Sequence, residues 1–336
     1  MRSSCLINCH NYVDYVGEAI DSALAQSKPF DEVIVVDDGS SDGSVDRIRK
    51  DYGGHAKVRL IAKPQGGQLS CFHVGLAESS GDLLFFLDAD DRYAPEMLRR
   101  VTDLYQRRPE IGFVSTGYRR FGAIEGWHPP ASGSRRRGIS VASAVLHRCW
   151  IGNPTSCLSM RRTMAQKVLP YPDESDWQTR ADDVLVLGSS IMGADKYHLE
   201  LPLVEYRIHD RNHFAGKRLG AVGKMQYALC VERMVNWYLR AARVDRDSIA
   251  YLLHREFRTC ERPSSKELRS YLRMLGRGRL PWSTRLDYAL NMVLHYANEF
   301  RRRKDTPSAV EPDVTVTESP RQANATGTSQ SNVKAA

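Results

Sequence analysis

The sequence predicts an α/β fold, with a mostly parallel sheet flanked by helices and a helical appendage at the C-terminal end. Three observations favour it. Short β-branched and apolar runs alternate with helical patterns, which is typical of a parallel sheet covered by helices. Two of the apolar runs end in acidic clusters, at residues 37–38 and 88–91. After residue 220 the apolar residues recur at helical spacing among many arginines.

The predicted elements follow these patterns along the chain. The run at 33–36 is continuously apolar, as expected of a strand buried on both faces, and the Ser and Asp residues after it are expected to cap a helix. Residues 119–138 are rich in Gly, Pro and Arg, so they are predicted to form a mobile loop. Strands are expected at residues 5–7, 33–36, 58–62, 83–87, 111–116, 155–160 and 197–208, and helices at 15–26, 69–79, 95–107 and 182–192.

Charge and composition divide the chain into three segments. Residues 1–215 form the α/β unit, and residues 216–304 form a basic helical region, in which 220–304 contain 18 Lys and Arg against 8 Asp and Glu. The net charge of +8 therefore resides in the C-terminal third, which argues against nucleic-acid binding by the N-terminal unit. Residues 305–336 are predicted to be disordered, because they contain too few apolar residues to offset the entropy of ordering.

Cysteine usage and hydropathy predict a cytoplasmic protein. The seven cysteines are scattered, without Cys-x-x-Cys spacing or a paired Cys/His pattern for zinc, which fits a reducing compartment. No run of about 18 apolar residues predicts a membrane span, and the first residues do not resemble a signal peptide.

The two acidic clusters are expected to face one cleft, because ligands of an open parallel sheet bind beyond the carboxyl ends of its strands. Converging carboxylates repel one another unless a cation or hydrogen-bond donors offset them. Mg²⁺ or Mn²⁺ is the simplest cation, since it joins one or two Asp to a substrate diphosphate. Each cluster alone is commonly only a turn or helix cap, so their conjunction is the informative feature. Neither Gly-x-Gly-x-x-Gly nor a P-loop is present to bind phosphate instead.

Four motifs in this order resemble family-2 glycosyltransferases of the GT-A fold, which move a sugar from a nucleotide diphosphate to an acceptor. The resemblance extends from about residue 5 to residue 214 and implies a nucleotide-sugar-binding catalytic domain over 1–215. The motifs are Asn11-Tyr12 with Tyr15 and the helix Ala19-Ile20-Asp21-Ser22-Ala23-Leu24-Ala25-Gln26; Val35-Val36-Asp37-Asp38-Gly39-Ser40-Ser41-Asp42; Phe86-Leu87-Asp88-Ala89-Asp90-Asp91 with Pro95; and Tyr206-Arg207-Ile208-His209 with Asn212.

The resemblance implies how the donor nucleotide would be bound. His10 stands where the family often has an aromatic residue that stacks on the base, and Asn11 belongs to the same loop. Asp38 would accept a hydrogen bond from the base, and Asp37 or Asp88 one from the ribose.

The same resemblance implies a site for the diphosphate and its metal, Mn²⁺ or Mg²⁺. Asp90 would be the main metal ligand as the last carboxylate of the Asp-x-Asp motif, with Asp88 beside it. His209 would contact the metal or the diphosphate, and Arg207 would help to neutralise the phosphate charge. An alternative is that residues 206–207 only pack and pair on the surface.

Asp183 and Asp182 match the acidic pair that precedes an apolar helix in the family. The match implies that Asp183 removes the proton of the acceptor hydroxyl and that Asp182 supports it. An inverting displacement needs such a carboxylate on the acceptor side of the anomeric carbon. The alternative is structural, with Asp182 capping the helix and Asp183 interacting with its dipole.

The chain also departs from the family pattern. Cys71, Phe72 and His73 take the places of a common Ala-Arg-Asn, which leaves the usual arginine contact without a counterpart. The first strand starts a few residues late. Processive synthases of the family contain Gln-x-x-Arg-Trp and membrane helices, and this chain has neither, which favours transfer of a single sugar.

The resemblance therefore implies an inverting transferase that uses a UDP, GDP or dTDP sugar and a glycan or lipid-linked acceptor, in surface polysaccharide or glycoconjugate synthesis. One alternative is a sugar nucleotidyltransferase, which would need a glycine-rich and basic loop where residues 8–11 stand. Another is a catalytically silent binding protein with the same fold. Phe72 and the short N-terminus favour the silent protein, whereas intact Asp38, Asp90 and Asp183 argue against it.

The basic region at 216–304 predicts peripheral contact with the inner face of a membrane. Its arginines, including the run at 301–304, could bind an anionic leaflet that contains a lipid-linked acceptor. Charge runs are more often only solvated faces. No nucleic-acid partner is expected, because neither interleaved aromatic residues nor a known binding module accompanies the arginines.

Overall fold

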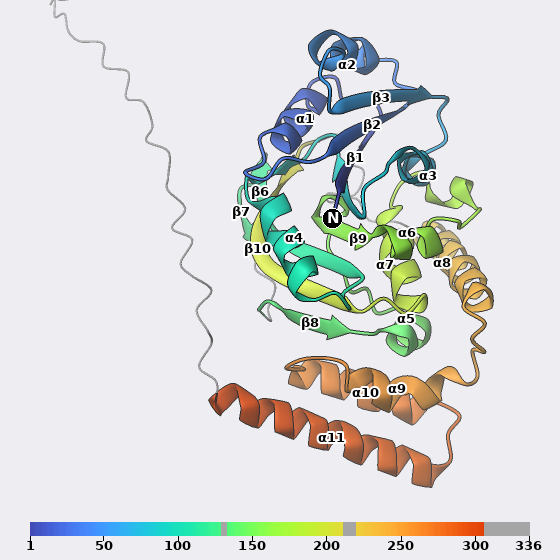
Figure 1. Ribbon diagram of the computed structural model, residues 1–336. Helices are drawn as coiled ribbons and strands as arrows, with labels where there is room; N and C mark the ends of the chain where they lie inside the picture. Colours follow the sequence, from blue (N-terminus) through green and yellow to red (C-terminus); the bar gives the residue numbers. More distant parts are fainter. Residues whose placement is uncertain (129–132, 211–219, 306–336) are drawn as a thin grey trace, which may run out of the picture.

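The computed structural model describes residues 1–128, 133–210 and 220–305, apart from the side chains of 127–128 and 303–305. The predicted disordered tail, 305–336, thus lies almost entirely outside the described residues. Figure 1 shows a sheet with helices on both faces and, at one end of the molecule, the helices α9 (Leu253–Phe257), α10 (Ser265–Arg277) and α11 (Trp282–Asp305).

The central sheet is mixed, but its long strands all pair in parallel, which confirms the predicted α/β fold. Strands β3-β2-β1-β4 form one parallel block, and β6 pairs in parallel with β10. The short β9 is antiparallel to β4 and β6 and joins the two blocks. The strands are β1 (Ser3–Cys9), β2 (Glu32–Asp38), β3 (Val58–Lys63), β4 (Leu83–Asp88), β5 (Arg92–Tyr93), β6 (Phe113–Gly122), β7 (Gly126–His128), β8 (Arg135–Gly138), β9 (Leu158–Arg161) and β10 (Lys196–Ile208).

The sheet separates two hydrophobic clusters, because neighbouring residues of a strand point to opposite faces. In β1, Leu6 packs with the side chains of α3, α6 and α7, whereas Cys5 and Ile7 pack with those of α1, α2 and α4. The helices are α1 (Val16–Leu24), α2 (Ser44–Tyr52), α3 (Gln68–Glu78), α4 (Met97–Arg107), α5 (Val141–His147), α6 (Arg162–Val168) and α7 (Asp182–Ile191).

The prediction of a mobile loop at residues 119–138 is wrong for the part that the structure describes. Strand β6 continues to Gly122, and β7 and β8 follow it. Arg135 of β8 is only 2% exposed and pairs with Glu267 at 2.7 Å, and Arg136 pairs with Asp195. These acidic partners come from distant segments, so the local composition did not reveal them.

Smaller differences concern the ends of elements. The strand expected at 155–160 begins as a 3₁₀ turn at Thr155–Cys157 and continues as β9. Helices α5 and α6 and strand β5 were not predicted. The N-cap residue of α2 is Gly43, which has no side-chain cap, so the expected Ser or Asp cap does not occupy that position. Asp42, directly before Gly43, accepts a hydrogen bond at 3.0 Å from the backbone N–H of Ser44.

The C-terminal region is helical, as predicted, and a buried carboxylate ties it to the rest of the protein. It contains α8 (Ala221–Ala241), α9 (Leu253–Phe257), α10 (Ser265–Arg277) and α11 (Trp282–Asp305). Glu256 of α9 accepts hydrogen bonds from the backbone N–H groups of Ala142 and Ser143 and from the hydroxyl of Tyr271. A negative charge is favourable at the start of α5 because of the helix dipole. Within residues 1–128, 133–210 and 220–305, no helix is long and apolar enough to cross a membrane.

Candidate active site

A cleft of about 1310 Å³ opens at the carboxyl ends of β1, β2 and β4. The first residues of α3 and α7 and one side of α8 form its walls. Five aspartates from three separate segments line it: Asp38, Asp88, Asp90, Asp182 and Asp183. The two acidic clusters therefore share one cleft, as the order of the strands predicts.

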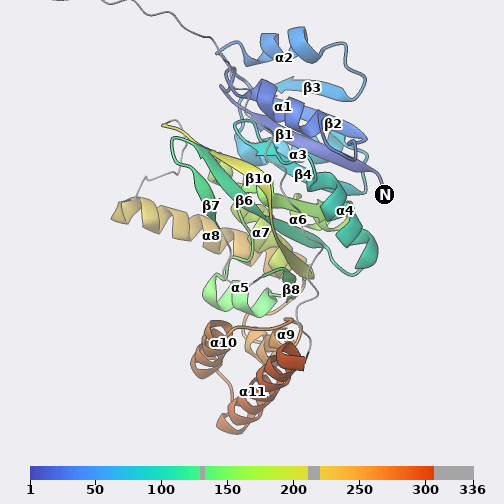
Figure 2. The same cartoon turned by 90° about the vertical axis from the view of Figure 1, so that its left-hand side faces the viewer.

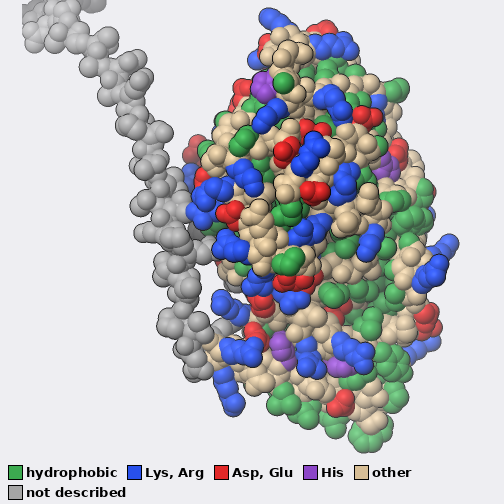
Figure 3. Space-filling view, viewed as in Figure 1, with side chains coloured by type: hydrophobic (Ala, Val, Ile, Leu, Met, Phe, Trp, Pro, Cys, Tyr) green, Lys and Arg blue, Asp and Glu red, His purple; other side chains and the backbone are tan. Residues whose placement is uncertain are grey.

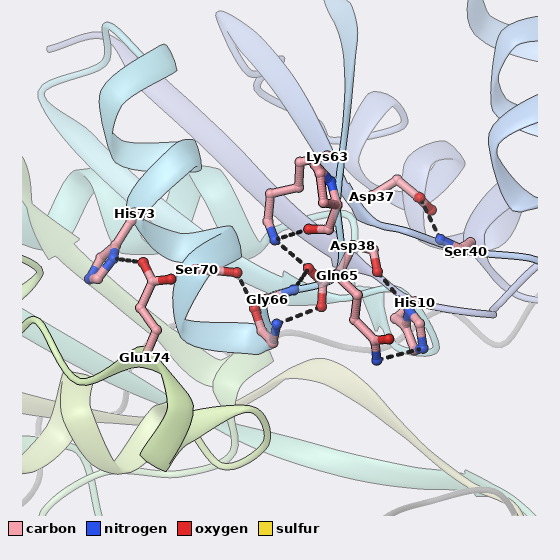
Figure 4. Close-up of polar contacts among 12 residues, drawn as sticks. His10, Asp37, Asp38, Ser40, Lys63, Gln65, Gly66, Ser70, His73 and Glu174 are labelled. Carbon is pink, nitrogen blue, oxygen red and sulfur yellow. Dashed lines mark hydrogen bonds and ion pairs between the residues drawn. The ribbon is translucent and has the colours of Figure 1, made fainter.

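Asp38 lies at one end of this cleft, and its negative charge is compensated (Figure 4). Its Oδ1 accepts a hydrogen bond from the N–H of Gly66 at 2.8 Å, and its Oδ2 accepts one from that of Gly67 at 2.7 Å. Lys63, its partner in register on β3, forms an ion pair with Oδ1. Burial opposes the charged form, but the hydrogen bonds from Lys63, Gly66 and Gly67 hold the pKa of Asp38 below its usual range.

Gly67 allows the chain to pass closely between Asp38 and the loop before α7. Its φ is +92°, and an added Cβ would lie 2.4 Å from the Cα of Gln178. Any larger residue would displace the loop or the N–H group that binds Asp38.

His10 lies beside Asp38 and lines the cleft. Its Nδ1 is 2.8 Å from the backbone oxygen of Asp38, and its Nε2 faces the amide nitrogens of Asn11 at 3.1 Å and Gln65 at 3.4 Å. These contacts fit a neutral ring that donates from Nδ1 and accepts at Nε2, a tautomer assigned from the network. Asn11 does not line the cleft; its Oδ1 accepts a hydrogen bond from the N–H of Ser41 and supports the His10 loop.

Asp37 points away from the cleft, because alternate residues of β2 face opposite sides of the sheet. Its Oδ1 accepts a hydrogen bond from the N–H of Ser40 at 2.9 Å, and the side chain is completely buried (Figure 4). The expected ribose contact through Asp37 thus conflicts with the geometry. Of the two ribose candidates, only Asp88 lines the cleft.

Asp88, Asp90 and Asp91 bring their carboxylates together directly after β4. One oxygen of each lies within 4.8 Å of those of the other two. Burial, and then repulsion from Asp90, raises the pKa of Asp88 and raises that of Asp91 well above its usual range. Buried carboxylates that repel one another favour a divalent cation, and hard oxygen ligands suit Mg²⁺ and Mn²⁺. These residues therefore fit the metal that the sequence predicts.

The partners of these carboxylates differ. Asp91 is held by the backbone N–H of Arg207 at 2.8 Å and the hydroxyl of Ser156 at 2.6 Å. Asp90 Oδ2 lies 2.9 Å from Nε2 of His209. Because Asp88 and Asp90 line the cleft whereas Asp91 does not, Asp91 supports the cluster from behind.

Strand pairing explains how His209 reaches Asp90. The short β5 follows the acidic cluster and pairs with Val204–Glu205 of β10, so the end of β10 returns to the cluster. The predicted association of His209 with the metal cluster therefore has a geometric basis.

Arg207 fixes the Asp90 loop and does not line the cleft. Its guanidinium donates to the backbone oxygen of Asp90 at 2.8 Å and to Glu18 at 2.7 Å. It also lies over the rings of Tyr15 and Phe121. With its hydrogen-bonding groups engaged in this way, its expected contact with phosphate is not supported by the geometry.

Asp182 and Asp183 begin α7 and face the same cleft. Asp183 is 2% exposed, accepts a hydrogen bond from the hydroxyl of Tyr227 at 2.8 Å and pairs with Arg180 at 3.1 Å. Burial, followed by the charge of Asp183, raises the pKa of Asp182; burial also raises that of Asp183, although Arg180 and Tyr227 oppose the shift. Raised carboxyl pKa values in a cleft are typical of proton-transfer sites. The N-cap residue of α7 is Ala181, so Asp182 does not occupy the cap position.

The comparisons with known proteins agree with this geometry. The model of glycosyl transferase family 2 matches residues 4–169. Residues 4–169 of the chain therefore belong to glycosyltransferase family 2. The chain is 32% identical over 220 residues to an uncharacterized glycosyltransferase of Nostoc sp., which covers 63% of this chain and 66% of the relative.

Other relatives of this family-2 chain match over a shorter range. A 113-residue segment is 34% identical to the chondroitin synthase of Pasteurella multocida and covers 34% of this chain and 12% of that protein. The chain thus spans less than two thirds of the length of the curated relatives that it matches.

Solved structures show the fold of this family-2 chain. TarS of S. aureus in complex with UDP-GlcNAc superposes with a TM-score of 0.58 at 17% identity, over 91% of this chain and 92% of that one. TarS in complex with UDP gives a TM-score of 0.56 at 16% identity, over 92% and 93% of the two chains. The family-2 chain therefore has the GT-A fold.

Gln68 is a site residue that the sequence analysis missed. Its side-chain amide donates to Asp88 at 2.9 Å, and its carbonyl oxygen accepts from the backbone N–H of Ala181 at 2.9 Å. It therefore links the metal cluster to the start of α7, directly before Asp182. Its position after two glycines at the start of a predicted helix was the available signal.

Tyr227 and Lys63 were also missed, because both act through partners distant in sequence.

Phe72 accounts for the departure from the family pattern at residues 71–73. It is buried against Phe86, with ring centroids 5.1 Å apart, so the place of the usual arginine is filled by a core residue. Cys71 lines the cleft, and His73 pairs with Glu174.

Proposed function

We propose that this family-2 chain is an inverting glycosyltransferase that moves a single sugar from a nucleotide diphosphate to an acceptor hydroxyl. The carrying observation is that Asp38, Asp88, Asp90, Asp182 and Asp183 line one cleft. Sugar transfer from a nucleotide diphosphate requires groups in this order along the cleft. One group binds the base, the next bind the diphosphate with its metal, and the last removes the proton of the acceptor hydroxyl.

The base and ribose of the donor are bound at the end of the cleft near Asp38. Asp38 is kept ionised by Lys63 and two backbone N–H groups, so it remains an acceptor for a base N–H at neutral pH. His10 offers a flat ring beside it for stacking. Asp88 accepts a hydrogen bond from the ribose or shares in metal binding.

The diphosphate is placed at Asp88 and Asp90. These two residues, with His209, would hold Mn²⁺ or Mg²⁺. A bound divalent ion stabilises negative charge on a departing diphosphate. Arg207 keeps the Asp90 loop in place through its contact with the backbone oxygen of Asp90.

Asp183 is the proposed base. Its carboxylate is held in one orientation by Tyr227 and Arg180, and its raised pKa makes it a stronger base than an exposed aspartate. Asp182, whose pKa is also raised, supports it. The acceptor hydroxyl attacks the anomeric carbon from this side, opposite the leaving diphosphate, so the configuration at that carbon is inverted.

The donor is a UDP, GDP or dTDP sugar, and the acceptor is a glycan or a lipid-linked molecule of surface polysaccharide synthesis. The relatives favour UDP, since the TarS structures contain UDP-GlcNAc and UDP and one sequence relative is named a chondroitin synthase. Trp150, Met225 and Leu229 give the α8 side of the cleft an apolar rim, which favours an acceptor with an apolar portion.

Two rival functions make different predictions. A sugar nucleotidyltransferase would bind a nucleoside triphosphate and a sugar phosphate. A silent binding protein would bind the donor without turnover.

A thermal-shift panel followed by a turnover assay separates the three functions. Each of UDP, GDP, dTDP and UTP is tested with and without Mn²⁺, since a ligand that binds only the native state raises its melting temperature. We expect a diphosphate to stabilise the protein only with Mn²⁺, and Asp90→Ala to remove this effect. Stronger stabilisation by UTP would favour the nucleotidyltransferase, and donor binding without nucleotide release across an acceptor panel would favour the silent protein.

A further inference from the structure

Helix α11 turns apolar side chains away from the protein. Trp282 is 79% exposed, Leu286 is 66% exposed and Leu290 is 58% exposed. Met292, on the opposite side, is completely buried, and His295 contacts the backbone oxygen of Cys260. The helix therefore packs on α9 and α10 with one side and exposes a second apolar side. The remaining exposed members are Val293, Leu294 and Phe300.

These six exposed side chains form one continuous face. At 100° per residue they fall within an arc of about 120°, and the distance from Trp282 to Phe300 along the helix is about 27 Å. Monomeric soluble proteins rarely expose a contiguous apolar face of this length, so it marks a surface that is covered by a partner.

Basic side chains accompany this face on the neighbouring helix α10. Lys266, Arg269, Arg273 and Arg277 are exposed and follow one another at i, i+3, i+7 and i+11, so they form one stripe. Figure 3 shows green apolar and blue basic side chains side by side at the end of the molecule where α9 to α11 lie.

Three of the acidic residues of this end pair with arginines outside the stripe. Glu261 pairs with Arg108, Glu267 pairs with Arg135 and Arg137, and Glu299 pairs with Arg302. Asp287 is exposed on α11. Exposed positive charge thus remains beside an exposed apolar face. The two views agree that α10 and α11 lie at one extremity of the molecule, where a planar surface can approach (Figures 1 and 2).

We propose that the apolar face of α11 and the basic stripe of α10 bind the surface of a bilayer that contains anionic lipids. The apolar face enters the boundary between headgroups and acyl chains, and the basic stripe pairs with the headgroups. A second copy of this chain fits less well, because it would bring two basic stripes together. The proposal is independent of the transferase function, since bilayer binding needs neither donor nor acceptor.

Vesicle flotation of the full chain tests the proposal. We expect the protein to float with vesicles of phosphatidylcholine and phosphatidylglycerol, at least tenfold less with phosphatidylcholine alone, and less as salt is raised. Leu290→Glu should reduce binding at least tenfold. Asn298→Glu, which adds the same charge at an exposed position of α11 outside the apolar face, should bind like the wild type.

A second variant tests the basic stripe in case Leu290→Glu does not fold, as judged by circular dichroism. Arg269→Gln with Arg273→Gln should retain the fold and lose most of the preference for anionic vesicles. Wild-type protein that does not float, or floats equally with both vesicles, overturns the proposal. So does a dimer that Leu290→Glu converts to a monomer without any vesicle binding, or binding to RNA in place of vesicles.

Discussion

The two ends of the cleft differ in how their negative charge is compensated. At one end, Asp38 has an ion pair and two backbone N–H donors, which hold its pKa below the usual range. At the other end, Asp88, Asp90 and Asp91 lie together, and burial with mutual repulsion raises the pKa of Asp88 and Asp91. At the first end, residues of the chain itself compensate the negative charge. At the second end, a bound cation would reduce the repulsion between the carboxylates.

The largest expected effect is on the acceptor side of the cleft, at the start of α7. Asp183→Asn removes the proposed base and should lower kcat by about 10²- to 10⁴-fold, with donor affinity unchanged. Steady-state turnover and donor titration measure the two quantities. Tyr227→Phe is the control, because it removes one hydrogen bond to Asp183 and keeps the carboxylate; a loss of only about tenfold is expected. Normal turnover in Asp183→Asn would reject the base assignment.

The next effect concerns the metal. Asp90→Asn should lower turnover by about 10²- to 10³-fold, the size of losing one strong electrostatic stabiliser, and remove the activation by Mn²⁺. The matched control is Asp46→Asn, an aspartate on α2 whose side chain is 88% exposed. If Asp90→Asn keeps its Mn²⁺ activation, the ion binds elsewhere.

A substitution at the compensated end should lower the free energy of unfolding and leave the affinity for Mn²⁺ unchanged. Lys63→Met leaves the buried Asp38 carboxylate without its cation and should lower the free energy of unfolding by about 1–3 kcal/mol. Denaturant unfolding measures this loss, and Lys50→Met, at an exposed position of α2, should change it by less than about 0.5 kcal/mol. Mn²⁺ affinity should be unchanged in Lys63→Met. An equal loss of Mn²⁺ affinity would show that the two ends are not independent.

The smallest effect is a pH dependence of two quantities that change in opposite directions. As pH rises, the stability of the metal-free protein should fall, whereas its affinity for Mn²⁺ should rise. Burial and Asp90 raise the pKa of Asp88 to about 7, above its value of 3.8 in an unfolded chain. Without metal the folded state therefore binds the extra proton, and this contribution to stability is present below pH 4 and lost as pH rises through 7. Mn²⁺ competes with the same proton, so its affinity should fall as pH falls below 7. Calorimetric Mn²⁺ titrations at pH 6, 7 and 8 measure this, and a flat profile would contradict it.

Much of the fold was predictable from the sequence, and the reasons are local. The runs at 33–36 and 83–87 are apolar enough to be strands, and strand topology then placed Asp38 and Asp90 at one edge. The arginines of β8 predict a loop from local composition, whereas their acidic partners, which lie more than 50 residues away in the sequence, hold them in a strand.

The candidate site was predictable only in part, for the same reason. Motifs identify Asp88 and Asp90, which line the cleft. Asp37 belongs to a motif too, but the alternation of side chains along β2 keeps it out of the cleft. Arg207 packs against Tyr15 and Phe121 and does not line the cleft either. Gln68 follows two glycines at the start of a predicted helix, but this local signal does not show its importance, which arises from two contacts with distant segments.

The central claim is that the compensated and uncompensated ends bind one nucleotide and one cation together. A crystal structure with UDP and Mn²⁺, with the metal located by its anomalous scattering, tests this most directly. The account predicts a single Mn²⁺ bound by Asp90 and the diphosphate, with the base beside Asp38 and His10. A nucleotide bound outside this cleft, or a diphosphate in the cleft with the Mn²⁺ bound away from Asp90, would contradict it.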